Sequence, residues 1–404
     1  MKVIKFGGAV LKDLSGFRAM LEILKRNAGN KILLVVSAFG KSTSILTRAA
    51  HVAETGDFNQ ACAVAAECLS KYDAIACETL SHDSSKFNAN EYLASVHEKL
   101  TNLLQGVSIT RELTRRTLDA IVACGEDAAL LTTELFLRDN HLSAAGIHAS
   151  ELISTDSNFG NAKPIADYTA DNITHRMPKM FLKADIVVTQ GFVAKDLYGE
   201  ITTMGLESSN LTAAIFAKVL GIKELEIYTD VCGIRTADPK LHAGTKCFRK
   251  MPFAEARRAG LSGLKLVFPA MISQLAGSGT RILIKNAFEP DGEFTEISEE
   301  ITAVEPADTL LLIERSPLVL YRDSSEDYKL PENAFVTYTN AEYKAVIQPE
   351  TPGNLRGAIR IKAEIHLAFS PKGRQDLLDL LKDLPADLRA ITFGNKRLSI
   401  YKEI

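Results

Sequence analysis

Short apolar runs alternate with longer stretches of mixed polarity through about the first 290 residues of the chain. The short runs are rich in valine, isoleucine and leucine, which is typical of strands buried on both faces of a parallel sheet. In the longer stretches, such as 13–27 and 211–221, apolar residues recur every three or four positions, as on one face of a helix. Repeated strand, crossover helix and strand predict an α/β fold with a central, mostly parallel sheet flanked by helices. The predicted strands are residues 3–6, 32–37, 147–153, 185–190, 224–229 and 281–285.

Two parts of the chain depart from this alternation. Residues 44–122 are mostly helical in pattern and contain few glycines, so we expect a helical insertion there. Residues 308–349 carry short strand-like pieces, and residues 363–403 show the order strand, helix, strand, strand. We therefore expect a first domain of residues 1–295 and a smaller α+β domain of residues 300–404.

Composition narrows the class of protein. A chain of 404 residues is too long for one ordinary core, and 46% hydrophobic with 24% charged residues is typical of a globular protein. The net charge of −3 gives no electrostatic reason to expect nucleic acid or a membrane surface as a partner. The sequence has no signal-peptide pattern and no apolar run of the roughly 18 residues that a membrane span needs. The six cysteines form no CxxC pair and no Cys/His cluster, so we expect a cytoplasmic protein with reduced thiols and without a metal or disulfide site.

The first candidate motif, KFGGAV, follows the first predicted strand. Gly7 and Gly8 would let the backbone approach a phosphate closely, and Lys5 would supply a positive charge. A tight turn beside a surface lysine explains the same residues, because neither GxGxxG nor the P-loop motif is present.

Three further motifs follow predicted strands or begin helices. In VVSAFGKST, the hydroxyls of Ser37 and Thr43 could bind a carboxylate or phosphate, or could serve as ordinary helix caps. Glu126 of CGEDAALL is predicted at a junction between a loop and a helix, where it could bind a ligand or complement the helix dipole. Thr229 and Asp230 end a strand before a glycine turn and could hold a nucleoside or form an Asx turn.

A last candidate is Lys265 in GLKLVFP. A lysine in an apolar stretch either extends its ammonium group to solvent or is directed at an anion.

In their order and spacing, these motifs resemble the aspartokinase branch of the amino-acid kinase family. The resemblance covers residues 1 to about 290 and implies an amino-acid-kinase-like fold. The stretches of this chain that correspond to the family's motifs are KFGGAV, VVSAFGKST, CGED, STDSNFGNA (154–162), VTQGF (188–192), TTMGLESSNLTAA (202–214), TDVCGIRTADPK and GLKLVFP.

The resemblance implies transfer of the ATP γ-phosphoryl group, with Mg²⁺, to the side-chain carboxylate of aspartate. This chemistry needs positioning and charge neutralisation rather than a strong base. By position, the resemblance assigns catalysis to Lys5 and Asn210, ATP binding to Lys5, Gly7, Gly8, Thr229, Asp230, Arg235, Lys240 and Lys265, and substrate binding to Ser37, Thr43, Glu126 and Ser209.

The stretch Met204–Asn210, MGLESSN, departs from the family's LGRGGSD. Leu206 replaces the arginine that would bind the substrate carboxylate, Glu207 and Ser208 replace two glycines, and Asn210 replaces the acid. Three hypotheses remain open: an aspartokinase whose carboxylate is bound elsewhere, for example by Lys41 or Arg48; a kinase for a different amino acid; or a catalytically silent binding or regulatory protein.

The tail lies where aspartokinases carry paired ACT domains, which bind effector amino acids between subunits. Residues 300–404 are short for two such units, so the resemblance implies one recognisable ACT-like unit and one eroded one. It also implies an amino-acid effector and a homodimer or higher homo-oligomer, since exposed sheet edges favour pairing.

Overall fold

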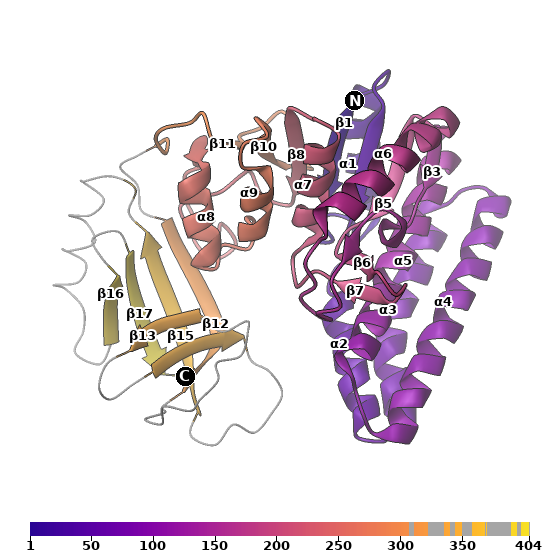
Figure 1. Ribbon diagram of the computed structural model, residues 1–404, viewed down its shortest axis with the longest axis horizontal. Helices are drawn as coiled ribbons and strands as arrows, with labels where there is room; N and C mark the ends of the chain where they lie inside the picture. The colour runs from indigo at the N-terminus through magenta and orange to yellow at the C-terminus, as the bar shows by residue number, and fades with distance from the viewer. Residues whose placement is uncertain are drawn as a thin grey trace. The chain divides into compact units, whose positions relative to one another are not determined.

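The computed structural model describes residues 1–306, 311–321, 335–339, 344–349, 358–367, 369, 389–393 and 397–403. The chain divides into two compact units, which are described separately below (Figure 1). The first unit comprises Met1–Gly233 and Leu266–Glu300, and the second comprises Ile234–Lys265 and Ile301–Ile404.

A mostly parallel sheet forms the centre of the first unit. Its strands lie in the order β3-β5-β2-β1-β8-β10-β11, and only β11 runs antiparallel to its neighbour in this order. The expected α/β fold class is confirmed. The strands are β1 (Lys2–Phe6), β2 (Ile32–Val36), β3 (Ala144–Gly146), β5 (Ile186–Gln190), β8 (Glu224–Thr229), β10 (Arg281–Asn286) and β11 (Thr295–Ser298).

Helices cover both faces of this sheet. Ile4 and Phe6 of β1 and Leu34 and Val36 of β2 join a core cluster with the helices α1 to α5. The alternate strand residues, such as Val3, are equally buried, and α7 packs against β1, β2 and β8. Burial on both faces explains why these strands read as continuous apolar runs. The remaining helices of the unit are α1 (Leu14–Arg26), α6 (Ala166–Lys183), α7 (Ser209–Val219) and α9 (Pro269–Leu275).

The expected insertion at 44–122 is helical, and its long helices lie side by side (Figure 1). The prediction that Glu126 lies at a junction between a loop and a helix is wrong, because α5 continues through it. Gly125 does not interrupt this helix; a β-carbon there would lie 3.3 Å from Leu46 Cδ1, so the glycine allows close packing of α2 on α5. The helices are α2 (Ser42–Glu54), α3 (Phe58–Thr79), α4 (Asp83–Thr110) and α5 (Arg115–Asp139).

The predicted strand at 147–153 is also wrong. Strand β3 ends at Gly146, and a 3₁₀ turn (Ala149–Glu151) follows. Ile147 N–H still donates to Val188 O at 2.9 Å, but the Ala149 N–H donates to the side chain of Gln190 at 3.1 Å. A side chain therefore replaces the strand partner and ends the pairing.

A small second sheet carries the chain toward α7. Its strand order is β4-β6-β7, with β6 and β7 forming an antiparallel hairpin. The strands are β4 (Ser154–Thr155), β6 (Val193–Asp196) and β7 (Ile201–Thr203).

The second unit contains an antiparallel sheet in the order β13-β14-β12-β15-β17-β16. The described residues of two predicted strand-like pieces, 309–314 and 317–322, lie in the single strand β12 (Leu311–Tyr321), which has an irregularity between Arg315 and Leu318. The predicted helix at 371–384 lies outside the described residues. The elements are β9 (Lys250–Pro252), α8 (Phe253–Leu261), β12 (Leu311–Tyr321), β13 (Phe335–Thr339), β14 (Lys344–Pro349), β15 (Ala358–Leu367), β16 (Arg389–Phe393) and β17 (Arg397–Glu403).

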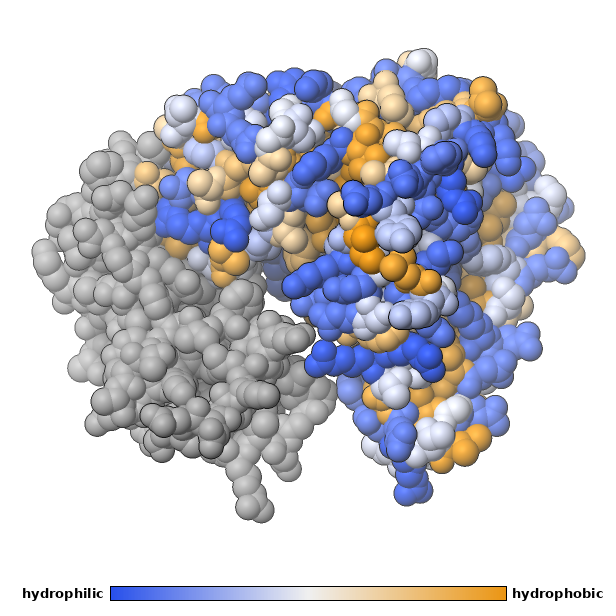
Figure 2. All heavy atoms as spheres, in the orientation of Figure 1, coloured by the Kyte–Doolittle hydropathy of each residue, from blue (hydrophilic) through white to orange (hydrophobic). Residues whose placement is uncertain are grey.

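The coloured surface in Figure 2 is mainly hydrophilic, with apolar residues scattered over it. None of the helices in the described part of the chain combines the length and the apolar character that crossing a membrane requires.

Candidate active site

The carboxyl ends of β1, β2 and β8 meet at one edge of the central sheet. Phe6 is in register with Val36 on one side and with Tyr228 on the other. The residues that follow these positions, Gly7, Ser37 and Thr229, therefore come together from three separate parts of the sequence. The carboxyl edge of a parallel sheet is the usual place for a ligand in α/β proteins.

The glycine turn after β1 packs directly on the backbone that follows β2. Gly40 N–H donates to Gly8 O at 2.8 Å, and Gly7 N–H donates to Tyr228 O at 3.0 Å. A β-carbon on Gly8 would lie 2.1 Å from Ala38 O, well inside contact distance. Any side chain at position 8 would therefore force two segments of this edge apart.

Lys5 places a buried positive charge beside this turn. The residue is 8% exposed, and its Nζ would lie 3.6 Å from a β-carbon on Gly7. Burial lowers the pKa of Lys5 to about 8, while the carboxylates of Glu126 and Glu207 act in the opposite direction. The surface-lysine alternative is therefore wrong, and the ammonium group is poorly solvated and close to two acidic side chains.

Glu126 is held from the middle of α5. Its Oε2 accepts a 2.8 Å hydrogen bond from Ala38 N–H, and the residue is 3% exposed. Burial raises the pKa of Glu126 to about 8, against the effects of the Ala38 N–H and the Lys5 charge. A buried acid and a buried base with strongly shifted pKa values are typical of functional sites.

Sequence analysis missed Tyr72, which fixes the loop after β2, the loop that Glu126 contacts through Ala38. Its hydroxyl donates to Gly125 O at 2.8 Å and accepts from Phe39 N–H at 3.0 Å. The backbone N–H groups of Ala38 and Phe39 are thus both held by side chains from helices. A tyrosine within an apolar helical pattern gives no sign of this role.

Ser37 and Thr43 are half-buried on either side of this loop. Thr43 lies in the first turn of α2, and no side chain caps that helix. The capping alternative for Thr43 is therefore wrong, whereas the neighbouring Ser42 hydroxyl donates to Phe39 O at 2.6 Å.

The departing stretch 204–210, called the 204–210 turn below, comprises the turn after β7 and the first two residues of α7. Gly205 and Glu207 both have positive φ, 89° and 67°, a conformation that costs an ordinary L-residue about 1 kcal/mol. Leu206 is 69% exposed. The turn therefore keeps a backbone that suits glycine at a position that holds glutamate.

Two polar atoms of this turn are buried without a partner in the described part of the molecule. They are Ser208 Oγ and Asn210 Oδ1, whereas Asn210 Nδ2 donates to Leu266 O at 3.4 Å. Ser209, which was assigned to substrate binding, is buried beside them at the first position of α7. Buried polar atoms without partners are uncommon and mark places where a ligand or ion can complete the hydrogen bonding.

Asp119 was also missed by sequence analysis. It lies on α5, is 2% exposed, and accepts hydrogen bonds from Gly160 and Thr203. Burial raises its pKa despite these bonds. It links the 154–162 motif to the strand that leads into the 204–210 turn.

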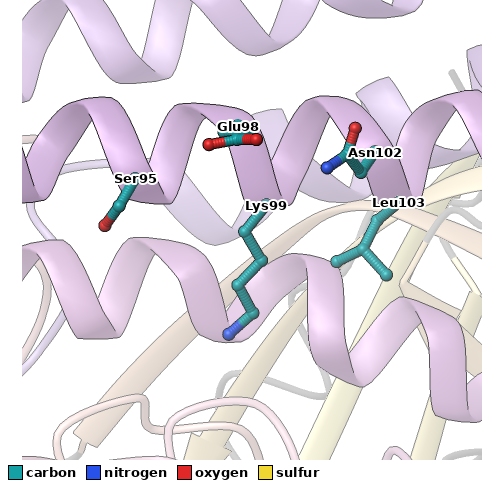
Figure 3. Close-up of a pocket in the computed structure, with 5 residues that line it drawn as sticks. All are labelled: Ser95, Glu98, Lys99, Asn102 and Leu103. Atoms are coloured by element: carbon teal, nitrogen blue, oxygen red, sulfur yellow. The ribbon is translucent and has the colours of Figure 1, made fainter.

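A further polar network surrounds Asp127. Gln190 Nε2 donates to Asp127 Oδ1 at 3.0 Å, and His148 Nδ1 lies 3.3 Å from the same oxygen. The Asp127 carboxylate raises the pKa of His148. Lys99 of α4 lies 3.5 Å from Asp127 Oδ2, and Figure 3 shows its side chain pointing away from its own helix.

The hollow in Figure 3 lies along α4 and has a volume of about 490 Å³. It is an open depression that contains none of the sequence-predicted site residues. Its lining residues are Ser95, Glu98, Lys99, Asn102 and Leu103.

The predicted nucleotide residues fall in both units. Thr229 and Asp230 lie at the end of β8, where the Thr229 hydroxyl donates to Asp230 Oδ1 at 3.3 Å. Arg235, Lys240 and Lys265 belong to the second unit. There the Arg235 guanidinium donates to Thr245 Oγ1 at 2.7 Å, and Lys240 and Lys265 are exposed. The nucleotide contacts of these three residues stay predictions.

The fold and the edge described above define a class of α/β proteins that bind a ligand at the carboxyl end of a parallel sheet. The chain belongs to the amino acid kinase family, whose model matches residues 1–286.

Curated relatives are aspartokinases. The chain is 28% identical to lysine-sensitive aspartokinase 3 of Escherichia coli over 297 residues, which cover 71% of this chain and 62% of the relative. It is 26% identical to chloroplastic aspartokinase 2 of Arabidopsis thaliana over 324 residues, 79% of this chain and 58% of the relative. The match thus spans about three fifths of the length of these relatives.

Solved structures share the fold. E. coli aspartokinase III in complex with aspartate and ADP superposes with a TM-score of 0.78 at 20% identity, covering 99% of this chain and 96% of that chain. The same enzyme in complex with lysine and aspartate gives 0.75 at 21% identity, covering 100% and 96%. These structural similarities confirm the expected fold, and the family match together with the curated relatives confirms the resemblance to aspartokinases that the motifs indicated.

Proposed function

We propose that the protein transfers the γ-phosphoryl group of ATP to the side-chain carboxylate of L-aspartate, giving 4-phospho-L-aspartate. The observation that carries this proposal is the meeting of buried Lys5, the Gly7–Gly8 turn and buried Glu126 at one sheet edge. The family membership and the aspartokinase relatives support it.

In this proposal, Lys5 neutralises the transferred phosphoryl group. A buried cation in a poorly solvated place interacts with developing negative charge more strongly than one in water does. Asn210 takes the second catalytic position, because its buried Oδ1 has no partner within the described residues. The nucleotide is bound by Gly7, Gly8, Thr229, Asp230, Arg235, Lys240 and Lys265.

Mg²⁺ would be coordinated mainly by the phosphates of the nucleotide and by water. The described residues contain no group of three or more His, Cys, Asp or Glu side chains that could hold a metal ion. Magnesium at nucleotide sites keeps several waters and takes few protein ligands, which fits such a site. Asn210 Oδ1 is a buried amide oxygen, a kind of ligand that Mg²⁺ can bind. When bound, the ion would neutralise charge on the β- and γ-phosphates.

The acceptor amino acid is bound by Ser37, Thr43, Glu126 and Ser209. The ammonium group of an amino acid suits Glu126, since a cation nearby favours the ionised carboxylate. Of the two replacements considered for the missing arginine, Arg48 is paired with Glu67 at 2.6 Å, whereas Lys41 is exposed next to Ser42. Lys41 is therefore the better candidate to bind the acceptor carboxylate.

A different amino acid is the second candidate acceptor. The carboxylate of Glu207 acts to raise the pKa of Lys5, so it lies close enough to interact with that ammonium group. The 204–210 turn therefore adds negative charge to the site where the family has glycine. That charge disfavours an acidic acceptor and favours one with less negative charge.

The test is ADP release from the purified protein with ATP, Mg²⁺ and a panel of amino acids. We expect turnover with aspartate in the wild type and its loss in Lys5→Ala. Turnover with another amino acid alone would select the second candidate. No turnover with any would leave the silent, regulatory hypothesis, and unchanged turnover in Lys5→Ala would reject the role of Lys5.

We propose for the second unit an ACT-like role in effector binding and homodimer formation, in a cytoplasmic enzyme. The antiparallel sheet of β12 to β17 supports this, since β13 and β16 are its edge strands. Sedimentation with and without candidate amino acids tests it; a monomer under all conditions would contradict the dimer.

A further inference from the structure

We propose that Asp119 is a positioning residue that fixes the 204–210 turn, called the acceptor turn below, relative to Glu126. The proposal rests on the proposed function only in its final step, which assigns the turn to the acceptor amino acid.

The Asp119 carboxylate accepts three hydrogen bonds from two separate segments. Thr203 donates its hydroxyl to Oδ1 at 2.7 Å and its N–H to Oδ2 at 2.8 Å. Gly160 N–H donates to Oδ2 at 2.9 Å. Hydrogen bonds to an ionised acceptor are the strong kind, and removing a buried acceptor leaves its donors unsatisfied.

The two segments are also joined to each other. Ala162 N–H donates to Thr203 O at 2.9 Å, and a β-carbon on Gly205 would lie 3.1 Å from Asn161 Oδ1. The turn begins at Met204, directly after Thr203, and Met204 N–H donates to Phe192 O at 3.0 Å. The position of Thr203 therefore determines where the turn starts.

Helix α5 carries both Asp119 and Glu126. Glu126 lies seven positions after Asp119, so the two residues lie on one face of the helix about 10 Å apart along its axis. Glu126 holds the loop after β2 through Ala38, and Asp119 holds the entry to the acceptor turn. A single rigid helix thus fixes the spacing between the two parts of the site to which the acceptor is assigned.

The chain offers a matched control on the same helix. Asp139, the last residue of α5, accepts from Ser81 N–H at 2.6 Å, from His82 N–H at 3.2 Å and from His82 Nδ1 at 2.6 Å. Like Asp119, it is buried and accepts hydrogen bonds from two backbone N–H groups and from side chains. It lies 20 residues further along, about 30 Å away along the helix.

The first experiment is kinetic and compares Asp119→Asn with Asp139→Asn. We expect Asp119→Asn to raise KM for the acceptor amino acid at least about tenfold, with KM for ATP changed less than about twofold. Asp139→Asn should lower thermal stability and leave both KM values as in the wild type. Equal changes in both KM values in Asp119→Asn, or the same acceptor effect in Asp139→Asn, would overturn the positioning role.

The second experiment, amide hydrogen exchange, does not depend on catalysis. Asp119→Asn should speed exchange at residues 158–162 and 203–210, whereas Asp139→Asn should speed it at residues 81–83 only. Unchanged exchange at 203–210 would overturn the proposal even if turnover is normal. If the wild type turns over no amino acid, the proposed function fails, and the exchange result still decides whether Asp119 holds the turn.

A milder variant covers the case in which Asp119→Asn does not fold. Thr203→Val removes one donor and keeps the branched shape of the side chain. It should give smaller changes in the same direction, in acceptor KM and in exchange at 204–210. Wild-type values for both in a folded Thr203→Val protein would contradict the proposal.

Discussion

At the scale of single residues, burial is the dominant influence on the charged groups of the site. Lys5 and Glu126 attract each other, yet burial lowers the pKa of Lys5 and raises the pKa of Glu126. Both shifts favour the neutral form of the group, because both groups are removed from water. This makes the charge state of the site sensitive to pH near neutrality and to any ligand that brings its own charge.

Glu126 makes the stability of the protein depend on pH. Its pKa rises from 4.5 to about 8 on folding, so the stability that it contributes is fully present below pH 4.5 and is lost as pH rises through 8. Glutamine stays neutral and can still accept from Ala38 N–H. The free energy of unfolding of Glu126→Gln, relative to the wild type, should therefore rise between pH 5 and 8 by on the order of 3 kcal/mol.

Urea unfolding at several pH values measures this difference. Glu22→Gln, which removes an exposed carboxylate on α1, provides the baseline. A difference that is flat or that falls over this range would show that Glu126 is ionised in the folded protein at neutral pH.

The departures from the family sequence in the 204–210 turn predict a weakened affinity for aspartate, which three substitutions should increase. Leu206→Arg supplies a bidentate partner for a carboxylate, Glu207→Gly removes a charge and a strained conformation, and Asn210→Asp returns the family's acid. The triple variant should bind aspartate at least about tenfold more tightly, the effect of one charged hydrogen bond. Calorimetry with an ATP analogue and Mg²⁺ measures the affinity.

Leu197→Arg is the control, because it adds the same charge at another exposed leucine on the neighbouring hairpin. If the triple variant and Leu197→Arg both leave the affinity for aspartate unchanged, the turn does not line the acceptor site.

At the scale of elements, the sequence predicts best what burial alone determines. Strands β2 and β5 are buried at every position, so their apolar runs are unambiguous. Residues 147–153 are apolar at both ends, but Gln190 takes the Ala149 N–H that a strand partner would need, and no local pattern reveals this contact. Tertiary contacts made by a single side chain are the main source of error in the predicted strands.

The site follows the same rule. Lys5, Gly7 and Gly8 could be proposed from the sequence because glycines after a strand have a direct physical meaning, and a β-carbon on Gly8 would lie very close to Ala38 O. Asp119 was missed because an aspartate in a helix is ordinarily a surface residue, and its three donors come from distant segments.

At the scale of the whole molecule, residues 234–265 group with the tail and not with the unit that precedes them. Buried Phe248 meets Phe369 edge-on at 5.4 Å between ring centroids, and the Arg258 guanidinium lies 5.1 Å from the centroid of the same ring. Backbone bonds join the parts as well, since Leu312 N–H donates to Thr236 O at 2.8 Å.

A chain cut after residue 300 should therefore lose order in 234–265. We expect rapid proteolysis within that segment, while 1–233 stays resistant because its own core is intact. Since Arg235, Lys240 and Lys265 are assigned to the nucleotide, KM for ATP should rise together with the cleavage rate. Limited proteolysis with mass spectrometry, compared with the full chain, measures the first effect.

Phe369→Ala in the full chain should give the same cleavage pattern in weaker form. A fragment 1–300 that is cleaved no faster in 234–265 than the full chain would contradict the grouping.

The same grouping has a consequence for building chimeras. A tail exchanged with that of a relative at residue 300 would bring a foreign partner to Phe248 and Arg258, and the graft would meet a surface shaped for another sequence. A graft that carries 234–265 and 301–404 together keeps both sides of that contact native. It would also replace Arg235, Lys240 and Lys265 by the donor's residues, so the positions proposed here to bind the nucleotide would be exchanged together with the tail.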